Sequence, residues 1–275
     1  MRIAINALFN KKLYKRFVFP VVFIVIVIRV ILALTNFRTT VPEGTIRGHV
    51  LNEKKELVRN ARVYVYLPGG QTIEDRTDWL GRFELSGLPD DQAFRIMVSY
   101  FEYGHQQFDG LTTGGNFDLQ IFPHGYELFG KQAPPLQVEK WFNSQPVSLQ
   151  QLRSKVVLLQ IGIHIDTYDD YNQTVLQMYE KYANKDLSVI ALYINTQGSW
   201  PRKTNEEEII AYLKQNNIDF PVGLDKAELG SSGATYKAYG SKASPAKYLI
   251  DKKGILCCSP MNKDLEKWIL RLLSE

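Results

Sequence analysis

The side chains best suited to chemistry are grouped in one short segment. His164, Asp166, Asp169 and Asp170 lie within seven residues. Imidazole and carboxylate groups can bind a divalent cation, and paired carboxylates can act in acid–base catalysis. An aspartate also suits the N-cap of a helix that begins near residue 170. The spacing matches no metal motif and nothing identifies a substrate, so we favour helix capping and leave the two chemical roles as alternatives.

The chain has two cysteines, Cys257 and Cys258, and they are neighbours in the sequence. A disulfide between neighbours closes a strained ring, so we do not expect a structural bridge. Neighbouring side chains on a strand point to opposite faces, so one thiol should be buried and the other should face outward. We interpret both as small apolar side chains. Redox chemistry and intermolecular pairing through the outward thiol are the alternatives.

The second half of the chain alternates between apolar runs and amphipathic helices. Apolar runs over residues 155–161 and 187–193 are typical of buried parallel strands. The turn at residues 251–254 lies between two further apolar runs and predicts a β-hairpin. Helices are predicted over residues 170–183, 206–215 (with Thr204 as N-cap), 227–239 and 264–273, and a further strand over 220–224. This order predicts a thioredoxin-like α/β fold for residues 130–275.

Four stretches of this half also carry a family resemblance. They are Ala-Pro-Pro-Leu at 133–136 with Pro-Val-Ser-Leu at 146–149, Lys-Val-Val-Leu-Leu at 155–159, Ser244-Pro245 after Phe-Pro-Val at 220–222 and Tyr-Gly at 239–240, and Leu-Ile-Asp-Lys-Lys-Gly at 249–254. They resemble the N-terminal hairpin, central strand, cis-proline and final hairpin of the TlpA/ResA-like, membrane-anchored thioredoxin-like thiol-disulfide oxidoreductases. That group is related to the redoxin and peroxiredoxin domains.

The chain departs from this family after the central strand, where the family has a Cys-x-x-Cys pair. Asp166 and Asp169 fall on the two cysteine positions, with Thr167 and Tyr168 between them. The pair works because a helix N-terminus lowers the pKa of one thiol and the second thiol resolves the mixed disulfide. A carboxylate does neither, so we predict no catalytic residue at these positions and no peroxidase activity. The resemblance implies that Tyr168, Ser244 and Pro245 line a peptide-binding groove.

Residues 44–123 alternate between short apolar-patterned runs and glycine-containing turns. Strands are predicted over residues 45–51, 61–67, 82–85, 94–101 and 116–122, in a domain of about seven strands that forms an all-β sandwich. The segments at 44–48, 60–65, 77–83 and 87–89 resemble the carboxypeptidase regulatory-like, or transthyretin-like, sandwich. The resemblance implies a hairpin turn at 77–83, with Asp78 capping it, Gly81 at positive φ and Phe83 in the core. The isolated His49 and His105 suggest no metal or catalytic role.

The N-terminus is basic and then apolar. Seven basic residues and no acidic ones precede Glu43, so the rest of the chain is slightly acidic although the whole carries a net charge of +4. An acidic remainder disfavours a nucleic-acid partner. Residues 1–16 predict a basic cytoplasmic segment and residues 17–35 a transmembrane signal-anchor. The eighteen residues 17–34, apolar apart from Arg29, would span about 27 Å of helix, close to the thickness of a membrane core. A cleaved signal peptide is the alternative.

Together these features predict an N-terminal transmembrane helix, an all-β sandwich and an α/β thioredoxin-like fold. We expect a cell-membrane protein with both folded domains outside the cytoplasm, where the cis-proline groove binds another protein or peptide. We expect neither a cofactor nor a metal. The main alternative is a thiol-disulfide oxidoreductase or peroxiredoxin-like enzyme that uses Cys257 and Cys258.

Overall fold

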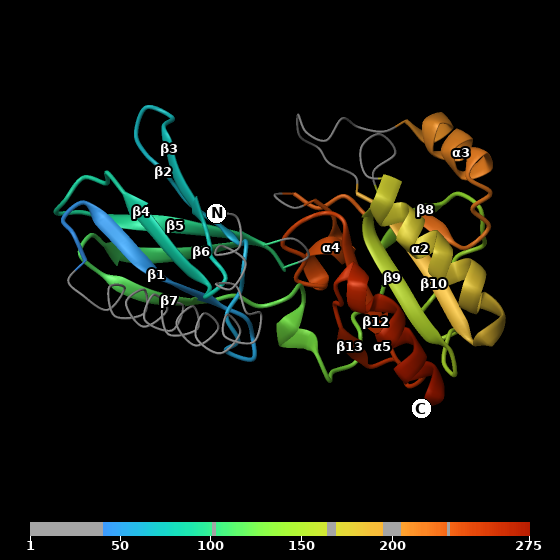
Figure 1. Cartoon of the computed structure of the whole chain (residues 1–275). Coiled ribbons are helices and arrows are strands. Elements are labelled where there is room, and N and C mark those ends of the chain that lie inside the picture. The colour runs from blue at the N-terminus through green and yellow to red at the C-terminus, as the bar shows by residue number, and fades with distance from the viewer. Residues whose placement is uncertain (1–40, 101–102, 164–168, 195–204, 230–231) are drawn as a thin grey trace, which may run out of the picture.

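The computed structural model describes residues 41–100, 103–163, 169–194, 205–229 and 232–275, without the side chains of residues 163 and 169–171. These residues form two lobes that lie side by side (Figure 1). The basic segment 1–16 and the predicted membrane segment 17–35 lie outside the described residues. Among the helices that are described, none is both long enough and apolar enough to cross a membrane.

The first lobe consists of two sheets that face each other across one apolar core. The seven strands are β1 (Thr45–Leu51), β2 (Arg62–Tyr66), β3 (Thr72–Arg76), β4 (Arg82–Ser86), β5 (Ala93–Tyr100), β6 (Gly104–Thr112) and β7 (Asn116–Gln120). One sheet has the order β4-β1-β7 and the other β3-β2-β5-β6. Alternate residues of both sheets, such as Val63, Phe83 and Ile96, fill the core between them. All five predicted strands are present, and β3 and β6 were missed.

The turn between β3 and β4 has the predicted local chemistry. The Asp78 carboxylate accepts hydrogen bonds from the backbone N–H groups of Leu80 at 2.8 Å and Arg82 at 2.9 Å. Gly81 has a φ of 67°, and Phe83 is buried. However, β3 and β4 belong to different sheets. The turn therefore carries the chain between the two layers, and the predicted hairpin is wrong.

The second lobe is a six-stranded mixed sheet with helices. Its elements are β8 (Val138–Trp141), β9 (Val156–Ile163), α2 (Asp169–Tyr182), β10 (Leu187–Tyr193), α3 (Glu206–Gln215), β11 (Val222–Asp225), α4 (Ala234–Ala238), β12 (Ala246–Ile250), β13 (Leu256–Cys258) and α5 (Asn262–Ser274), with 3-10 turns η2 (Tyr126–Leu128) and η3 (Ala183–Lys185). The strand order is β13-β12-β9-β10-β11-β8. Strands β9, β10 and β11 are parallel, whereas β8, β12 and β13 run antiparallel to their neighbours.

Each face of this sheet has its own core. Leu158 and Val189 point toward α2 and α5, together with Val175 and Ile269 of those helices. Residues such as Leu159 and Tyr248 pack on the opposite face with the segment that precedes β9. The helices and strands thus surround a central β9 that is buried on both faces, as its apolar run, broken only by Gln160, predicts.

Three local predictions for this lobe are corrected by the structure. Asn205, not Thr204, caps α3, in a capping box with Glu208. Helix α4 is shorter than predicted because the buried Asp225 carboxylate accepts the backbone N–H groups of Thr235 and Tyr236, which fixes the start of the helix. The expected N-terminal hairpin of residues 133–136 and 146–149 is not formed, because the strand in that region, β8, pairs with β11.

Candidate functional site

The loop between α4 and β12 lies against the end of the central strand. The Ser244 hydroxyl donates a hydrogen bond to the Gly162 carbonyl of β9 at 3.0 Å. Gly162 has a φ of 89°, and a Cβ atom placed on it would lie 1.9 Å from Ser244 Oγ, so only glycine permits this approach. The Ser244–Pro245 peptide bond is cis, which confirms that prediction.

Of the site residues predicted from the sequence, the structure places Ser244 and Pro245 together at this position. Asp166 and Tyr168 lie outside the described residues. Asp169 is the first residue of α2, one position before the predicted helix start, and its side chain is likewise outside the description. The described residues contain no group of three or more His, Cys, Asp or Glu side chains that could hold a metal ion.

The first lobe holds the other side of the same loop. His124, in the segment that joins the lobes, accepts a hydrogen bond at Nδ1 from the Lys242 backbone N–H at 2.9 Å. The Lys242 ammonium group donates to the Phe122 carbonyl at 3.1 Å, and the Gln106 side chain of β6 donates to that carbonyl at 3.0 Å. Gly104, at the start of β6, packs directly on His124 and Lys242. The loop that ends in Pro245 is therefore fixed to both lobes.

Burial governs the electrostatics of this junction. The His124 side chain is completely buried, and burial, with the nearby positive charge of Lys242, lowers its pKa to about 3. Its Nε2 atom has no hydrogen-bond partner in the described part of the chain. Burial also lowers the pKa of Lys242, although the Glu127 carboxylate opposes this. The junction is thus built around a neutral imidazole.

A buried polar cluster lies beneath the start of α2, and the sequence analysis did not identify it. Gln160 of β9 donates to the Asn172 side chain of α2 at 2.9 Å, and Asn172 donates to the Tyr212 hydroxyl of α3 at 2.9 Å. Lys247, which is opposite Gln160 in the sheet, is buried and donates to Asn262. The signal in the sequence was a glutamine and a lysine inside two apolar strands.

The two thiols lie elsewhere in the sheet. Cys257 and Cys258 are on β13 and are both free, Cys257 partly buried and Cys258 buried. Cys258 is opposite Leu249, four residues along β12 from Pro245, which corresponds to about 13 Å of strand. Burial, helped by the negative charge of Asp251, raises the pKa of Cys257 to about 11, and burial raises the pKa of Cys258 further.

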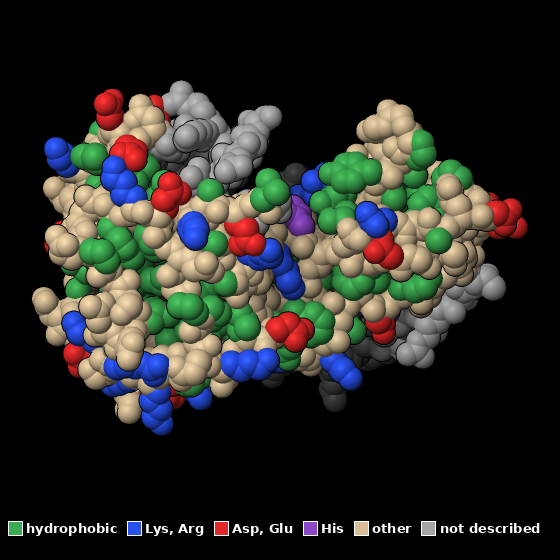
Figure 2. Space-filling view, turned by 180° about the vertical axis from the view of Figure 1, so that it is seen from behind, with side chains coloured by type: hydrophobic (Ala, Val, Ile, Leu, Met, Phe, Trp, Pro, Cys, Tyr) green, Lys and Arg blue, Asp and Glu red, His purple; other side chains and the backbone are tan. Residues whose placement is uncertain are grey.

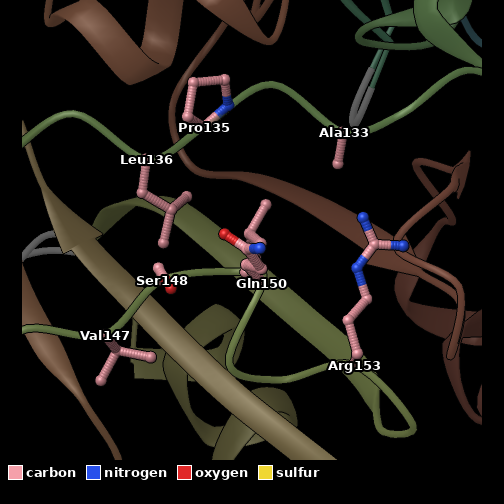
Figure 3. Close-up of a pocket in the computed structure, with 8 residues that line it drawn as sticks. Ala133, Pro135, Leu136, Val147, Ser148, Gln150 and Arg153 are labelled. Carbon is pink, nitrogen blue, oxygen red and sulfur yellow. The ribbon is translucent and has the colours of Figure 1, made fainter.

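A surface cavity of about 590 Å³ lies on the face of the sheet that α4 also covers. Figure 3 shows Leu136, Val147 and Ser148 on one side of it and Arg153 on the other. The Arg153 guanidinium donates to the Gln132 side chain at 2.6 Å and packs on Gly254. The polar groups that line the cavity are exposed and no buried one points into it, so we do not assign it a ligand.

The strand order, the parallel β9-α2-β10 unit and the antiparallel β12-β13 pair define a thioredoxin-like α/β fold for the second lobe. No family model matches the chain, and no curated protein matches it. Among solved structures, a thioredoxin-like superfamily protein is 25% identical, with a TM-score of 0.46, over 52% of this chain and 97% of its own length.

Two further solved structures are similar to this chain. A thiol-disulfide isomerase from Corynebacterium glutamicum is 25% identical, with a TM-score of 0.44, over 52% of this chain and 97% of its own. The thioredoxin domain of a thiol-disulfide oxidoreductase from Bacteroides vulgatus is 15% identical, with a TM-score of 0.40, over 51% and 97%. The fold class stated above depends on the topology of this chain and not on these scores.

Proposed function

We propose that this protein is a membrane-anchored, extracytoplasmic binding module whose thioredoxin-like lobe holds an extended segment of another protein at the Ser244–Pro245 loop, without redox chemistry. The observation that carries the proposal is the separation of the thiols from this loop. The loop sits at the end of β9, whereas both thiols are on β13 and are largely shielded from solvent.

Thiol chemistry requires a thiolate, and the surroundings of both cysteines oppose its formation. With a pKa of about 11, less than one Cys257 side chain in a thousand is ionised at pH 7.5. Neither cysteine lies at a helix N-terminus, which is the arrangement that activates a thiol in this fold. This argues against the alternative in which Cys257 and Cys258 catalyse thiol-disulfide exchange.

The loop offers unpaired backbone groups for strand addition. In the described part of the chain, the N–H and carbonyl of Ala243 have no hydrogen-bond partner, and residues 241–245 are all partly exposed. An extended peptide can pair with such backbone groups through its own N–H and carbonyl groups. The support for a membrane anchor is the basic and then apolar sequence of residues 1–35.

An insulin-reduction assay on the full-length chain in detergent tests the redox part of the proposal. We expect no turnover. The Asp166→Cys/Asp169→Cys variant, which restores the family's cysteine pair at the matching positions, serves as the positive control. Wild-type turnover that Cys257→Ser or Cys258→Ser abolishes would show that the protein is an oxidoreductase.

A selection from random nine-residue peptides displayed on phage, with the full-length chain as bait, tests the binding part. We expect enriched peptides relative to bare matrix. Hydrogen-exchange measurements with an enriched peptide should then show protection of the amides of residues 241–244 and 246, since Pro245 has no N–H. Residues 251–255, at the other end of β12, are the internal control and should not change. Failure to enrich any peptide, or protection that avoids the loop, overturns the proposed function.

A further inference from the structure

Two arginines and a histidine form a row across the outer face of the β3-β2-β5-β6 sheet, with Ser99 between Arg62 and His105. The strand register places Arg76 opposite Arg62, Arg62 opposite Ser99, and Ser99 opposite His105. Residues that are directly opposite each other share one face of a sheet. Val63, Val98 and other residues of the alternate set fill the core, so this row faces away from it.

The row lies at the end of the sandwich that meets the second lobe. His105 directly follows Gly104, where an added Cβ atom would lie 2.9 Å from Lys242 Cβ. Lys242 is two residues before Ser244, so the row begins next to the proposed peptide-binding loop. Figure 2 shows Lys and Arg side chains and a histidine gathered at the waist between the lobes, with a few acidic side chains beside them.

The acidic side chains near this row leave part of its positive charge unbalanced. Glu74 forms an ion pair with Arg62, whose guanidinium also lies 4.5 Å from the centre of the Tyr64 ring. Glu127 acts on Lys242 from a distance. Within the described residues, no carboxylate lies within ion-pair distance of Arg76 or Lys242. Arg76 is therefore left without an ion pair among the described residues, and Lys242 has no carboxylate partner there, although its ammonium group donates to the Phe122 carbonyl.

We propose that this row (Arg76, Arg62 and His105), together with Lys242, extends the peptide-binding site onto the first lobe and selects partner segments that carry Asp or Glu. The inference rests on the proposed function. The Ser244–Pro245 loop binds the backbone of the peptide, and the row recognises the charge of the peptide's side chains. Neighbouring strands are about 4.8 Å apart, so His105 and Arg62 are separated by roughly 10 Å. Three or four residues of an extended peptide cover that distance, which places the carboxylates several residues from the part bound at Ala243.

The composition of the peptides selected above tests this inference directly. Peptides enriched by the wild-type chain should contain more Asp and Glu than the starting library. One enriched acidic peptide and its Glu→Gln, Asp→Asn counterpart are then compared by fluorescence anisotropy at low salt. The acidic form should bind on the order of tenfold more tightly, and the difference should shrink at high salt.

Variants of the row locate the effect. Arg76→Gln and Arg76→Gln/His105→Gln should lower the affinity for the acidic peptide by about threefold or more and leave the affinity for the neutral peptide unchanged. Arg95→Gln is the matched control, because Arg95 is a cation of β5 that pairs with Asp109 at 2.7 Å, several residues along the strand from Ser99. Arg95→Gln should change the affinity for neither the acidic nor the neutral peptide.

The outcomes separate the two proposals. If no peptide is enriched, the proposed function fails. A second outcome is binding at residues 241–246 without a preference for acidic residues, or with a preference that Arg76→Gln/His105→Gln does not reduce. Either result supports binding at the loop and contradicts charge selection by the row. If the same variant instead lowers binding to vesicles of phosphatidylglycerol and leaves peptide affinity intact, the row serves a membrane surface and the inference is overturned.

Discussion

The Ser244–Pro245 loop and the thiol-bearing strand β13 are two regions of one lobe, and they are built in opposite ways. The loop is partly exposed, is hydrogen-bonded to β9 and is fixed to the first lobe by Lys242. Strand β13 carries the chain's two cysteines, and both pack against the apolar core. Strand β13, which carries the thiols, is therefore shielded from solvent, whereas the accessible loop offers backbone hydrogen-bonding groups. This difference supports the proposal that the lobe binds a segment of another chain and does not exchange disulfides.

Thiol reactivity gives the strongest test of this difference between the loop and β13. Because burial raises the pKa of Cys257 to about 11, its alkylation by iodoacetamide at pH 7.5 should be on the order of a hundredfold slower than that of glutathione. The rate should climb as the pH rises toward 11, and Cys258 should react more slowly still. Mass spectrometry of timed samples distinguishes the two sites. Alkylation as fast as that of a free thiol would remove the contrast between the regions.

Gly162→Ala tests how closely the loop is held to β9. The new methyl group would overlap Ser244 Oγ, and the residue would keep a positive φ, so we expect a loss of about 3 kcal/mol in the free energy of unfolding. Gly130→Ala is the control, since Gly130 has a φ of 80° and open space around it. Denaturant titrations should show a much smaller loss there, and Gly162→Ala/Ser244→Gly should recover part of the stability. Equal losses in Gly162→Ala and Gly130→Ala would mean that the contact with Ser244 is unimportant.

Protonation of His124 should make the stability of the folded chain depend on pH. In the folded chain His124 stays neutral down to about pH 3, whereas the unfolded residue takes up a proton near pH 6.5. Its depressed pKa therefore leaves stability intact above pH 6.5 and removes it as the pH falls from 6.5 toward 3, by a few kcal/mol in total. His124→Asn retains an acceptor for the Lys242 N–H but cannot take up a proton. It should flatten this part of the stability profile, measured as the unfolding midpoint at successive pH values. An unchanged slope would show that another group controls it.

Much of the fold could be predicted because its signals are local. The strand at 187–193 and the helix at 206–215 were predicted to the residue, since apolar runs and helical periodicity need no distant partner. Strands β3 and β6 were missed because their sequences are polar, with only scattered apolar residues such as Ile73, Phe108 and Leu111. They are strands because neighbouring β2 and β5 supply the hydrogen bonds.

The site was less accessible to sequence reasoning. Strand alternation predicted that one thiol would be buried and the other would face outward, without saying which. In the structure Cys258 is buried and Cys257 is partly buried. The importance of Ser244 and Pro245 came only from a family resemblance. The contact of Lys242 with His124 joins residues 118 positions apart, and no local pattern encodes it. The row of Arg62, Arg76 and His105 can likewise be identified only once the strand register is known.

Gly104→Ala tests the remaining attachment, in which the first lobe supports the loop. Gly104 and Gly110 both lie on β6 with positive φ, at 69° and 78°, so alanine costs similar backbone strain at either position. They differ in surroundings, because a Cβ at Gly104 would lie 2.8 Å from His124 Cε1 and 2.9 Å from Lys242 Cβ, whereas Gly110 has nothing within 4 Å. We expect Gly104→Ala to cost about 1–2 kcal/mol more than Gly110→Ala, from the overlap alone. Hydrogen exchange should then speed up at residues 240–244 in Gly104→Ala and stay unchanged in Gly110→Ala. If the two variants behave alike, the loop is positioned by β9 alone, and the difference between it and β13 arises within the second lobe without help from the first.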